Sequence, residues 1–308
     1  MAAKELERQT RQVFDRIHRQ HLETPQSVER FRSLISTQNL RVPSDFFHDK
    51  LCVDVGAGSS GCGTVNLLQL GARHVVALEL DCSFAESLRP VLDAEPEYAG
   101  RWSLRTGSVL DLPFADNSFD FVLCQGVLHH TADEQRGLSE ICRVTRAGGN
   151  ALITVGGGGG IATRLFKGLL RDEYQNDPFF HEFIDNRLSV EWVQTQIGFL
   201  RDNLEDDGSP RHHDALQLLD ALERLVDRDF ILSVLDRIQA PKYATYTTQQ
   251  LEEMFATAGF SSWYRVSRRP KYDNIRRIFS ILYEKHDHDL ARLLYGEGGL
   301  NYVLQARA

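Results

Sequence analysis

The sequence lacks the features that would place it in a membrane, in a disulfide-stabilised scaffold or on a nucleic acid. No run of about 20 apolar residues, the length that spans a bilayer, occurs in its 308 residues. Five cysteines, an odd number without paired spacing, argue against a disulfide framework. The formal net charge is −8, and no basic block could follow a phosphate backbone. We therefore expect neither a membrane nor a nucleic acid as a partner.

The first residues, MAAKELERQTRQ, also lack the apolar stretch of a secretion signal. The composition, 42% hydrophobic and 25% charged, is ordinary for a globular protein and sufficient for a large core. These observations predict a cytoplasmic enzyme or binding protein.

The most informative stretch begins with the short apolar segment LCVDV, which predicts a buried strand. A turn at Gly56, Gly58 and Gly61 follows, and glycine lets the backbone approach a ligand closely. After a short helical segment, a second apolar strand ends at Glu79 and Asp81. This order is typical of the start of a doubly wound nucleotide-binding sheet. At this point a dinucleotide-dependent dehydrogenase and a tight turn without any ligand remain alternative explanations of the glycines.

The order of the predicted elements divides the chain into four parts. We expect an N-terminal helical cap over residues 1–45, a Rossmann-like core over 46–156, an inserted helical lid over 157–240 and completion of the sheet over 241–308. The amphipathic helices of the third part are too many for a simple crossover between strands, so they indicate a lid, with a helical packing or dimer face as the alternative. Five consecutive glycines at 156–160 fit either a flexible hinge or a backbone that passes close to a ligand.

Four segments then resemble a known family in their order and spacing: DVGAGSSG, ALELD, GSVLDLPFADNSFDFVLCQGVLHH and RVTRAGGNALITV. They are similar to a class I S-adenosylmethionine (SAM)-dependent methyltransferase, in particular to the small-molecule, methyltransferase type 11-like group. The position of Asp54 before the glycines and the LPF…SFD block do not belong to a dehydrogenase, which removes that interpretation. The resemblance implies an α/β fold with a doubly wound, Rossmann-like, seven-stranded, mostly parallel sheet, helices on both faces, and SAM as the cofactor.

The resemblance also implies which residues would hold the methionine part of SAM. Gly56, Ala57 and Gly58 would line this end, and Asp54 would contact the amino group directly or through water. Gln125, at the end of the fourth strand, would face the methionine portion near the methyl group that is transferred.

The ribose and the adenine would lie at the next two strand ends. Glu79 would hold the ribose hydroxyls, in preference to Asp81. Ser108 and Val109 would flank the adenine. The family usually has Asp where Ser108 stands, which leaves the usual hydrogen bond to the adenine amino group open.

Three residues are catalytic candidates on the acceptor side. Tyr243 and Tyr246 lie where acceptor-contacting aromatic residues commonly occur in such enzymes, with core packing as the alternative. His18, on the N-terminal helix, is the third candidate, against a surface histidine on a packed helix. His129 and His130 are read mainly as structural, and no spacing predicts a metal site.

Three functions remain open from the sequence. The first is methyl transfer from SAM to a small-molecule acceptor in a lidded active site. The second keeps the fold but uses SAM as its own substrate, closing an azetidine-2-carboxylate ring and releasing methylthioadenosine. The third is a non-catalytic SAM-binding regulatory protein whose inserted helices form a partner surface. The acidic chain and the lid favour a small molecule as the partner, and a homodimer is possible.

Overall fold

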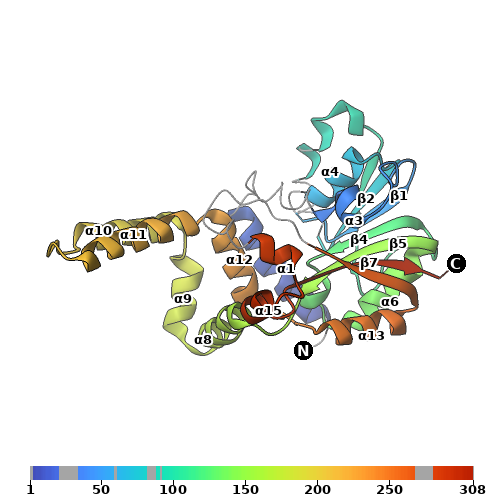
Figure 1. The fold of residues 1–308 in the computed structure, drawn as a ribbon. Coiled ribbons are helices and arrows are strands. Elements are labelled where there is room, and N and C mark those ends of the chain that lie inside the picture. Colours follow the sequence, from blue (N-terminus) through green and yellow to red (C-terminus); the bar gives the residue numbers. More distant parts are fainter. Residues whose placement is uncertain are drawn as a thin grey trace.

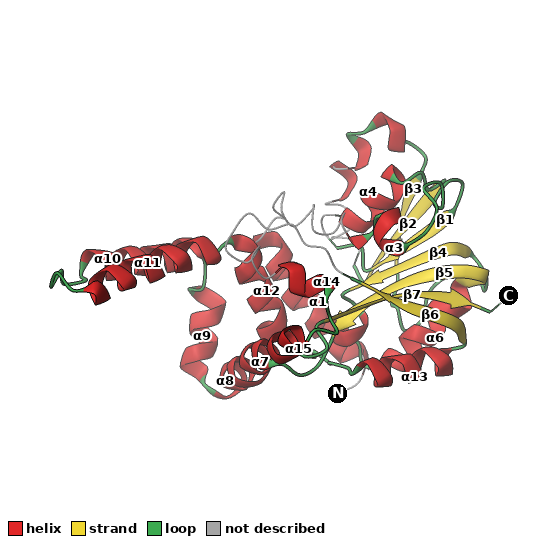
Figure 2. Cartoon of the chain, in the orientation of Figure 1, coloured by secondary structure: helices red, strands yellow, loops and turns green. Residues whose placement is uncertain are grey.

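One mixed β-sheet forms the centre of the protein (Figures 1 and 2). The computed structural model describes residues 3–20, 34–58, 61–81, 88–90, 92–267 and 280–307. Within these ranges, a seven-stranded sheet has the order β3-β2-β1-β4-β5-β7-β6. This sheet confirms the predicted doubly wound α/β fold.

The strand directions explain why the sheet has one functional edge. Strands β1 to β5 are parallel, and β7 is antiparallel to both of its neighbours, β5 and β6. The carboxyl ends of all the parallel strands therefore lie at the same edge, where ligands bind in such sheets. The strands are β1 Leu51–Val55, β2 His74–Glu79, β3 Trp102–Thr106, β4 Phe119–Gln125, β5 Thr145–Gly156, β6 Phe260–Val266 and β7 Gly299–Ala306.

Helices cover both faces of this sheet, which is why its central strands are apolar on both sides. On one face lie α3 (Thr37–Leu40) and α4 (Cys62–Gln69), whose buried side chains share a core cluster with β1 and β2. On the other face lie α6 (Glu134–Val144) and α13 (Thr248–Ala258), which pack against β4, β5 and β7. The capping box expected at the start of α13 is present: Thr247 and Gln250 satisfy each other's backbone N–H groups.

The LPF…SFD block is held by one arginine of α6. The guanidinium of Arg143 donates to the carbonyl oxygens of Leu112 and Phe114, at 3.0 and 2.8 Å, and also pairs with Asp116 and Glu140. This motif therefore fixes the loop between β3 and β4 against α6, and its sequence reflects packing more than chemistry.

A second group of helices lies beside the carboxyl edge of the sheet (Figure 1). The N-terminal helix α1 is part of this group because it contacts α12. Its Ile17 packs in a small core with side chains of α8, α9 and α12. The helices of this group are α1 Ala3–Gln20, α7 Ile161–Thr163, a π-helical segment Arg164–Leu169, α8 Leu170–Asn176, α9 Pro178–Asn186, α10 Val190–Asp202, α11 Pro210–Leu225, α12 Arg228–Gln239, α14 Ser280–Glu284 and α15 Asp289–Tyr295.

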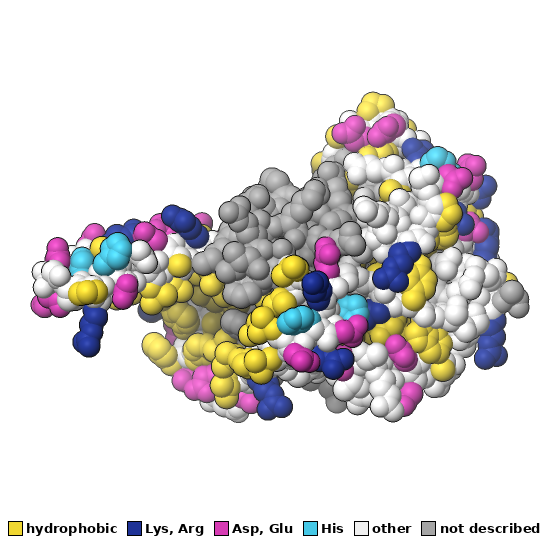
Figure 3. Space-filling view, viewed as in Figure 1, with side chains coloured by type: hydrophobic (Ala, Val, Ile, Leu, Met, Phe, Trp, Pro, Cys, Tyr) yellow, Lys and Arg dark blue, Asp and Glu magenta, His cyan; other side chains and the backbone are white. Residues whose placement is uncertain are grey.

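The helices α10 and α11 form a hairpin that projects away from the sheet (Figures 1 and 3). Phe199 and Leu218, one on each helix, are 62% and 61% exposed, so the hairpin leaves apolar side chains uncovered. Figure 3 shows further apolar side chains over α7, α8 and α15. Leu169, in the π-helical segment between α7 and α8, is 65% exposed. No described helix is long and apolar enough to cross a membrane.

The five-glycine segment 156–160 lies against another stretch of backbone. Gly157 donates its N–H to the carbonyl oxygen of Gly298 at 2.7 Å. A Cβ atom on Gly157 would come within 2.5 Å of that oxygen, and one on Gly160 would overlap the backbone nitrogen of Gly296. Gly160 also has φ 72° and ψ 156°, a conformation that is open essentially only to glycine. The close approach of two backbone segments therefore accounts for glycine at these two positions.

This packing predicts a large effect of adding one methyl group. We expect Gly160→Ala to lower the free energy of unfolding by about 3 kcal/mol, because it adds backbone strain to a steric overlap. Urea unfolding followed by circular dichroism measures the change. The control is Gly198→Ala, inside α10, where a Cβ meets no atom within 4 Å. This control should raise the stability by about 0.5–1 kcal/mol. Equal stability of Gly160→Ala and the wild type would show that the segment tolerates side chains.

Candidate active site

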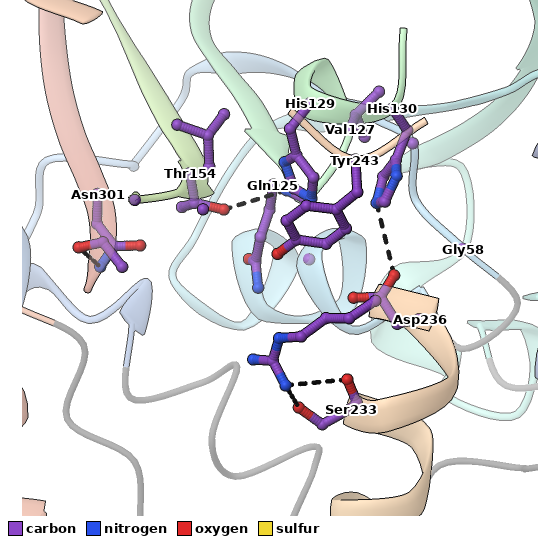
Figure 4. A pocket seen from close by; sticks show the side chains of 18 of the residues that line it. Gly58, Gln125, Val127, His129, His130, Thr154, Ser233, Asp236, Tyr243 and Asn301 are labelled. Carbon is purple, nitrogen blue, oxygen red and sulfur yellow. Dashed lines mark hydrogen bonds and ion pairs between the residues drawn. The ribbon is translucent and has the colours of Figure 1, made fainter. Parts of the chain in front are cut away.

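A cavity of about 770 Å³ opens at the carboxyl edge of the sheet. Its volume lies within the range of about 300–1,000 Å³ that is typical of small-molecule sites. The turns after β1 to β5 line one side, and residues of α1, α12 and the segment after α12 line the other. Figure 4 shows part of this lining, with Gln125 between Thr154 and Tyr243 and with Ser233 and Asp236 across the cavity.

Glu79 closes the glycine turn from the neighbouring strand. The backbone N–H of Gly58 donates to its Oε1 atom at 2.6 Å, and the N–H of Leu80 donates to Oε2 at 3.1 Å. Burial raises the pKa of Glu79, while these two backbone hydrogen bonds favour the ionised form. A carboxylate oxygen can accept more than one hydrogen bond, so the side chain can still accept from a ligand hydroxyl. Asp81 instead forms an ion pair with Arg11 of α1.

Asp54 is a buried carboxyl group directly below the glycine turn. Its Oδ2 atom accepts a hydrogen bond from the hydroxyl of Thr64 at 2.9 Å. A Cβ atom on Gly63 would lie 2.5 Å from the same oxygen, so glycine is needed there. Burial raises the pKa of Asp54 to about 7. The hydrogen bond from Thr64 lowers this pKa, and the nearby charge of Glu79 raises it further. Because this pKa is above the unfolded value, the ionisation of Asp54 lowers the stability of the ligand-free protein as the pH rises to about 7.

Gln125 brings an amide group to the middle of the cavity. It is the last residue of β4, and Figure 4 shows its side chain pointing into the cavity. Its Nε2 atom is buried and has no hydrogen-bond partner among the described residues. A buried donor without a partner costs about 1–3 kcal/mol, so this atom suits a ligand that accepts a hydrogen bond.

Gly56 and Ala57 continue the lining next to this amide. Their N–H groups both donate to the carbonyl oxygen of Leu78, which holds the turn against β2. Gly56 has φ 77°, and a Cβ atom there would overlap the side chain of Val127. The turn therefore needs glycine at this position for its own geometry, in addition to any approach of a ligand.

Ser108 and Val109 line the cavity beyond β3. The hydroxyl of Ser108 accepts from the N–H of Leu110 at 3.0 Å and donates to Oε1 of Glu7 at 2.5 Å. Val109 is only 6% exposed and offers an apolar surface. The structure thus brings every residue that was predicted to contact SAM to one cavity.

Tyr243 lies in the same cavity, against two histidines of the turn after β4. Its ring centroid is 4.7 Å from that of His129 and 5.2 Å from that of His130. His130 bonds through Nδ1 to the carbonyl oxygen of Lys242 at 2.8 Å, and its Nε2 atom lies 3.5 Å from Asp236 of α12. Burial opposes ionisation of Asp236, but the contacts with His130 lower its pKa to about 2. His130 therefore connects the sheet edge to the helical layer. No group of three or more potential metal ligands occurs among the described residues.

Tyr246, another catalytic candidate, is not among the described residues that line the cavity. Tyr246 packs against the core cluster on the α6 and α13 face, and burial raises the pKa of its hydroxyl. Its backbone bonds to Gly156 and Gly158, which directs this part of the chain along the sheet edge. The ring of Tyr246 is therefore packed against the core, and its catalytic role stays a prediction. The side chain of His18 lies outside the described residues, so its role stays a prediction.

Several lining residues were missed by the sequence analysis. Glu7, Thr10 and Arg11 reach the cavity from α1, and Ser233 and Arg237 reach it from α12. Their spacing of three and four residues places each set on one helix face, which is the only sequence signal that they carry. Arg237 donates to the carbonyl oxygen of Ser233 at 2.9 Å and also contacts its hydroxyl. Neither set lies near a recognised motif.

Comparisons with known proteins agree with this geometry. Residues 53–153 match the family model described as "Methyltransferase domain". The demethylmenaquinone methyltransferase of Thermobifida fusca is 32% identical over 111 residues, which cover 35% of this chain and 44% of that protein. The glycine/sarcosine/dimethylglycine N-methyltransferase of Actinopolyspora halophila is 30% identical over 138 residues, which cover 45% of this chain and 24% of that protein. The matched part thus spans less than half the length of either relative.

A solved structure resembles the chain over most of its length. It is a putative methyltransferase in complex with the Trm112 methyltransferase activator of Haloferax volcanii. The TM-score is 0.50 at 15% identity, and the alignment covers 90% of this chain and 91% of the other. At this identity the likeness concerns the fold alone. Residues 53–153 thus match a methyltransferase domain, and the seven-stranded sheet that contains them supports assignment to the class I SAM-dependent methyltransferases.

Proposed function

We propose that this protein transfers the methyl group of SAM to a small-molecule acceptor bound in the cavity at the carboxyl edge of the sheet. The observation that carries the proposal is that one cavity joins the glycine turn and Glu79 to the Tyr243 region. A cofactor on the first side and an acceptor on the second would then meet beside Gln125. The family match over residues 53–153 supports the cofactor half of this proposal.

The residues of the cofactor half fit the chemical groups of SAM. Glu79 would accept hydrogen bonds from the ribose hydroxyls, and Asp54 would face the positively charged amino group. The amide N–H of Gln125, which has no hydrogen-bond partner in the described part of the chain, suits the methionine carboxylate, which accepts hydrogen bonds only. Gly56, Ala57 and Gly58 present backbone rather than side chains along this part of the cavity.

The acceptor half is built from aromatic and cationic side chains. We infer that Tyr243, held against His129 and His130, forms one wall for the acceptor. Arg237, from α12, lines the same cavity. The helices between β5 and α13, together with α1, would act as the lid that keeps water away from the reacting atoms. We also retain the homodimer as a prediction.

The residues of the chain would contribute to the reaction mainly by positioning the acceptor and SAM. Bound SAM would supply an activated methyl group, and the electron pair of the broken carbon–sulfur bond would stay on sulfur when the acceptor atom bonds to the carbon. The protein has to align the acceptor with that bond and exclude water, and alignment can supply about 7–11 kcal/mol in favourable cases. An aromatic ring near a cation adds about 0.5–2 kcal/mol, and we propose that Tyr243 supplies such a ring.

The first test is to incubate the purified protein with SAM alone and to follow the products by mass spectrometry. We expect SAM to bind and to remain intact, because methyl transfer requires an acceptor. Adding candidate small metabolites should then produce S-adenosylhomocysteine (SAH) only with the correct acceptor. Glu79→Ala should abolish both binding and turnover.

Two results would contradict the proposal. Catalytic accumulation of methylthioadenosine from SAM alone, lost in Glu79→Ala, would point to cyclisation of SAM to azetidine-2-carboxylate. SAM binding without turnover over a broad panel of acceptors would point to a regulatory SAM-binding protein.

The raised pKa of Asp54 predicts a proton release when SAM binds. At a pH of about 6 the carboxyl group, with a pKa of about 7, is mostly protonated in the free protein. An ammonium group beside it favours the carboxylate and lowers that pKa, so binding should release up to about one proton. Affinity for SAM should accordingly increase as the pH rises towards about 7.

Isothermal titration calorimetry in two buffers of different ionisation enthalpy measures this release. We expect the observed enthalpy to differ between the buffers for the wild type and to be nearly the same for Asp54→Asn. A buffer-independent enthalpy in the wild type would mean that Asp54 does not sense the amino group.

A further inference from the structure

We propose that the N-terminal helix α1 recognises the base of SAM, with Glu7 accepting a hydrogen bond from the amino group of adenine. This inference rests on the proposed binding of SAM and adds a residue outside the matched segment 53–153. It assigns to α1 a part in selecting the nucleotide, in addition to covering the cavity.

The order of the strands places the base end of the cavity beside α1. Glu79 ends β2 and would hold the ribose, with the methionine turn and Gln125 on one side of it, after β1 and β4. The strand on the other side of β2 is β3, and the loop after it brings Ser108 and Val109 into the lining. A base attached to that ribose and directed away from Gln125 therefore lies over this loop.

At this end Glu7 supplies an acidic group that Ser108 holds in place. Ser108 donates its hydroxyl hydrogen to Oε1 of Glu7, and its own oxygen accepts from Leu110. The second oxygen of Glu7, Oε2, accepts no hydrogen bond among the described residues. Ionised carboxylates only accept, so a ligand group at this position has to donate. The exocyclic amino group of adenine donates hydrogen bonds, whereas the oxygen of hypoxanthine at the same position only accepts.

Thr10 provides an independent sign that α1 faces a polar ligand. It lies one turn after Glu7 on the cavity side of the helix, and its hydroxyl oxygen is buried without a hydrogen-bond partner among the described residues. Buried hydroxyls in native proteins are nearly always satisfied, so this atom lacks a partner that a bound molecule can supply. The ion pair between Arg11 and Asp81 anchors this part of α1 to the end of β2. Glu7, Thr10 and Arg11 thus lie on the face of α1 that lines the cavity, and Glu7 and Arg11 contact the ends of β3 and β2.

The test compares two product analogues that differ only in the base, SAH and S-inosylhomocysteine. Calorimetric titration gives the dissociation constants of both for the wild type and for Glu7→Gln. A glutamine side chain can still accept from Ser108 through its oxygen, but it presents an N–H donor where Glu7 presented an acceptor. We expect Glu7→Gln to weaken SAH binding about tenfold and to reduce the preference for SAH over S-inosylhomocysteine at least as much. Thr10→Val should weaken the binding of SAH without improving the binding of S-inosylhomocysteine.

Glu5→Gln is the matched control, because Glu5 lies on the same helix and pairs with Arg8 at the surface. It should leave both dissociation constants unchanged, and thermal unfolding checks that all variants are folded. If Glu7→Gln binds the two analogues with the wild-type ratio, the role of Glu7 is refuted although SAM binding stands. If the wild type binds neither analogue nor SAM, the proposed function fails and this inference fails with it.

Discussion

The hydrogen bond from the backbone of Gly58 to the carboxylate of Glu79 is the contact on which the cavity depends. It joins the turn after β1 to the end of β2, so the two strands present their ends as one surface. It also holds the carboxyl group of Glu79 at a partly buried position, where the backbone N–H groups of Gly58 and Leu80 compensate part of the lost hydration. A side chain that only accepts hydrogen bonds thereby stays oriented towards the cavity. Asp54, one strand away and more deeply buried, has fewer such contacts and a pKa of about 7.

The helical layer is organised by another carboxylate, that of Asp185 on α9. It accepts from the hydroxyl of Tyr174 on α8 at 2.9 Å and from the amide of Gln239 on α12 at 2.8 Å. It also pairs with Arg16 of α1 at 3.0 Å. Four helices from three distant parts of the chain therefore meet at one side chain. Because α1 and α12 both line the cavity, this junction fixes the two helices that close it opposite the sheet.

The sequence predicted those features that depend on local order. The strand–turn–helix–strand unit, the acid at the end of β2 and the capping box at Thr247 are each defined within a few residues. The resemblance extended this to the whole sheet. Features that depend on distant contacts were not accessible. The glycine run 156–160 was explained only by its contact with backbone at 296–298, far along the chain.

The two tyrosines between α12 and α13 also show that the sequence does not predict contacts between distant parts of the chain. Tyr243 and Tyr246 are three residues apart in a stretch without helix or long strand, so no periodicity assigns them a face. The bridge between Tyr246 and Gly157 turns one ring towards the core, whereas Tyr243 is left against the histidines. Equally, nothing near Glu7 in the sequence indicates Ser108, its partner a hundred residues later.

This division between local and distant contacts also separates the two halves of the site. Asp54, Glu79 and Gln125 fall inside the matched segment 53–153, and each lies at or next to the carboxyl end of its own strand. Tyr243 and Arg237 fall outside it and depend on how the helices pack. A sheet edge of fixed geometry can keep one cofactor while the helices around it change. Under the proposed function, the residues that select an acceptor should therefore be sought in α1, α12 and the segment around Tyr243, which lie outside the segment that matches the family model.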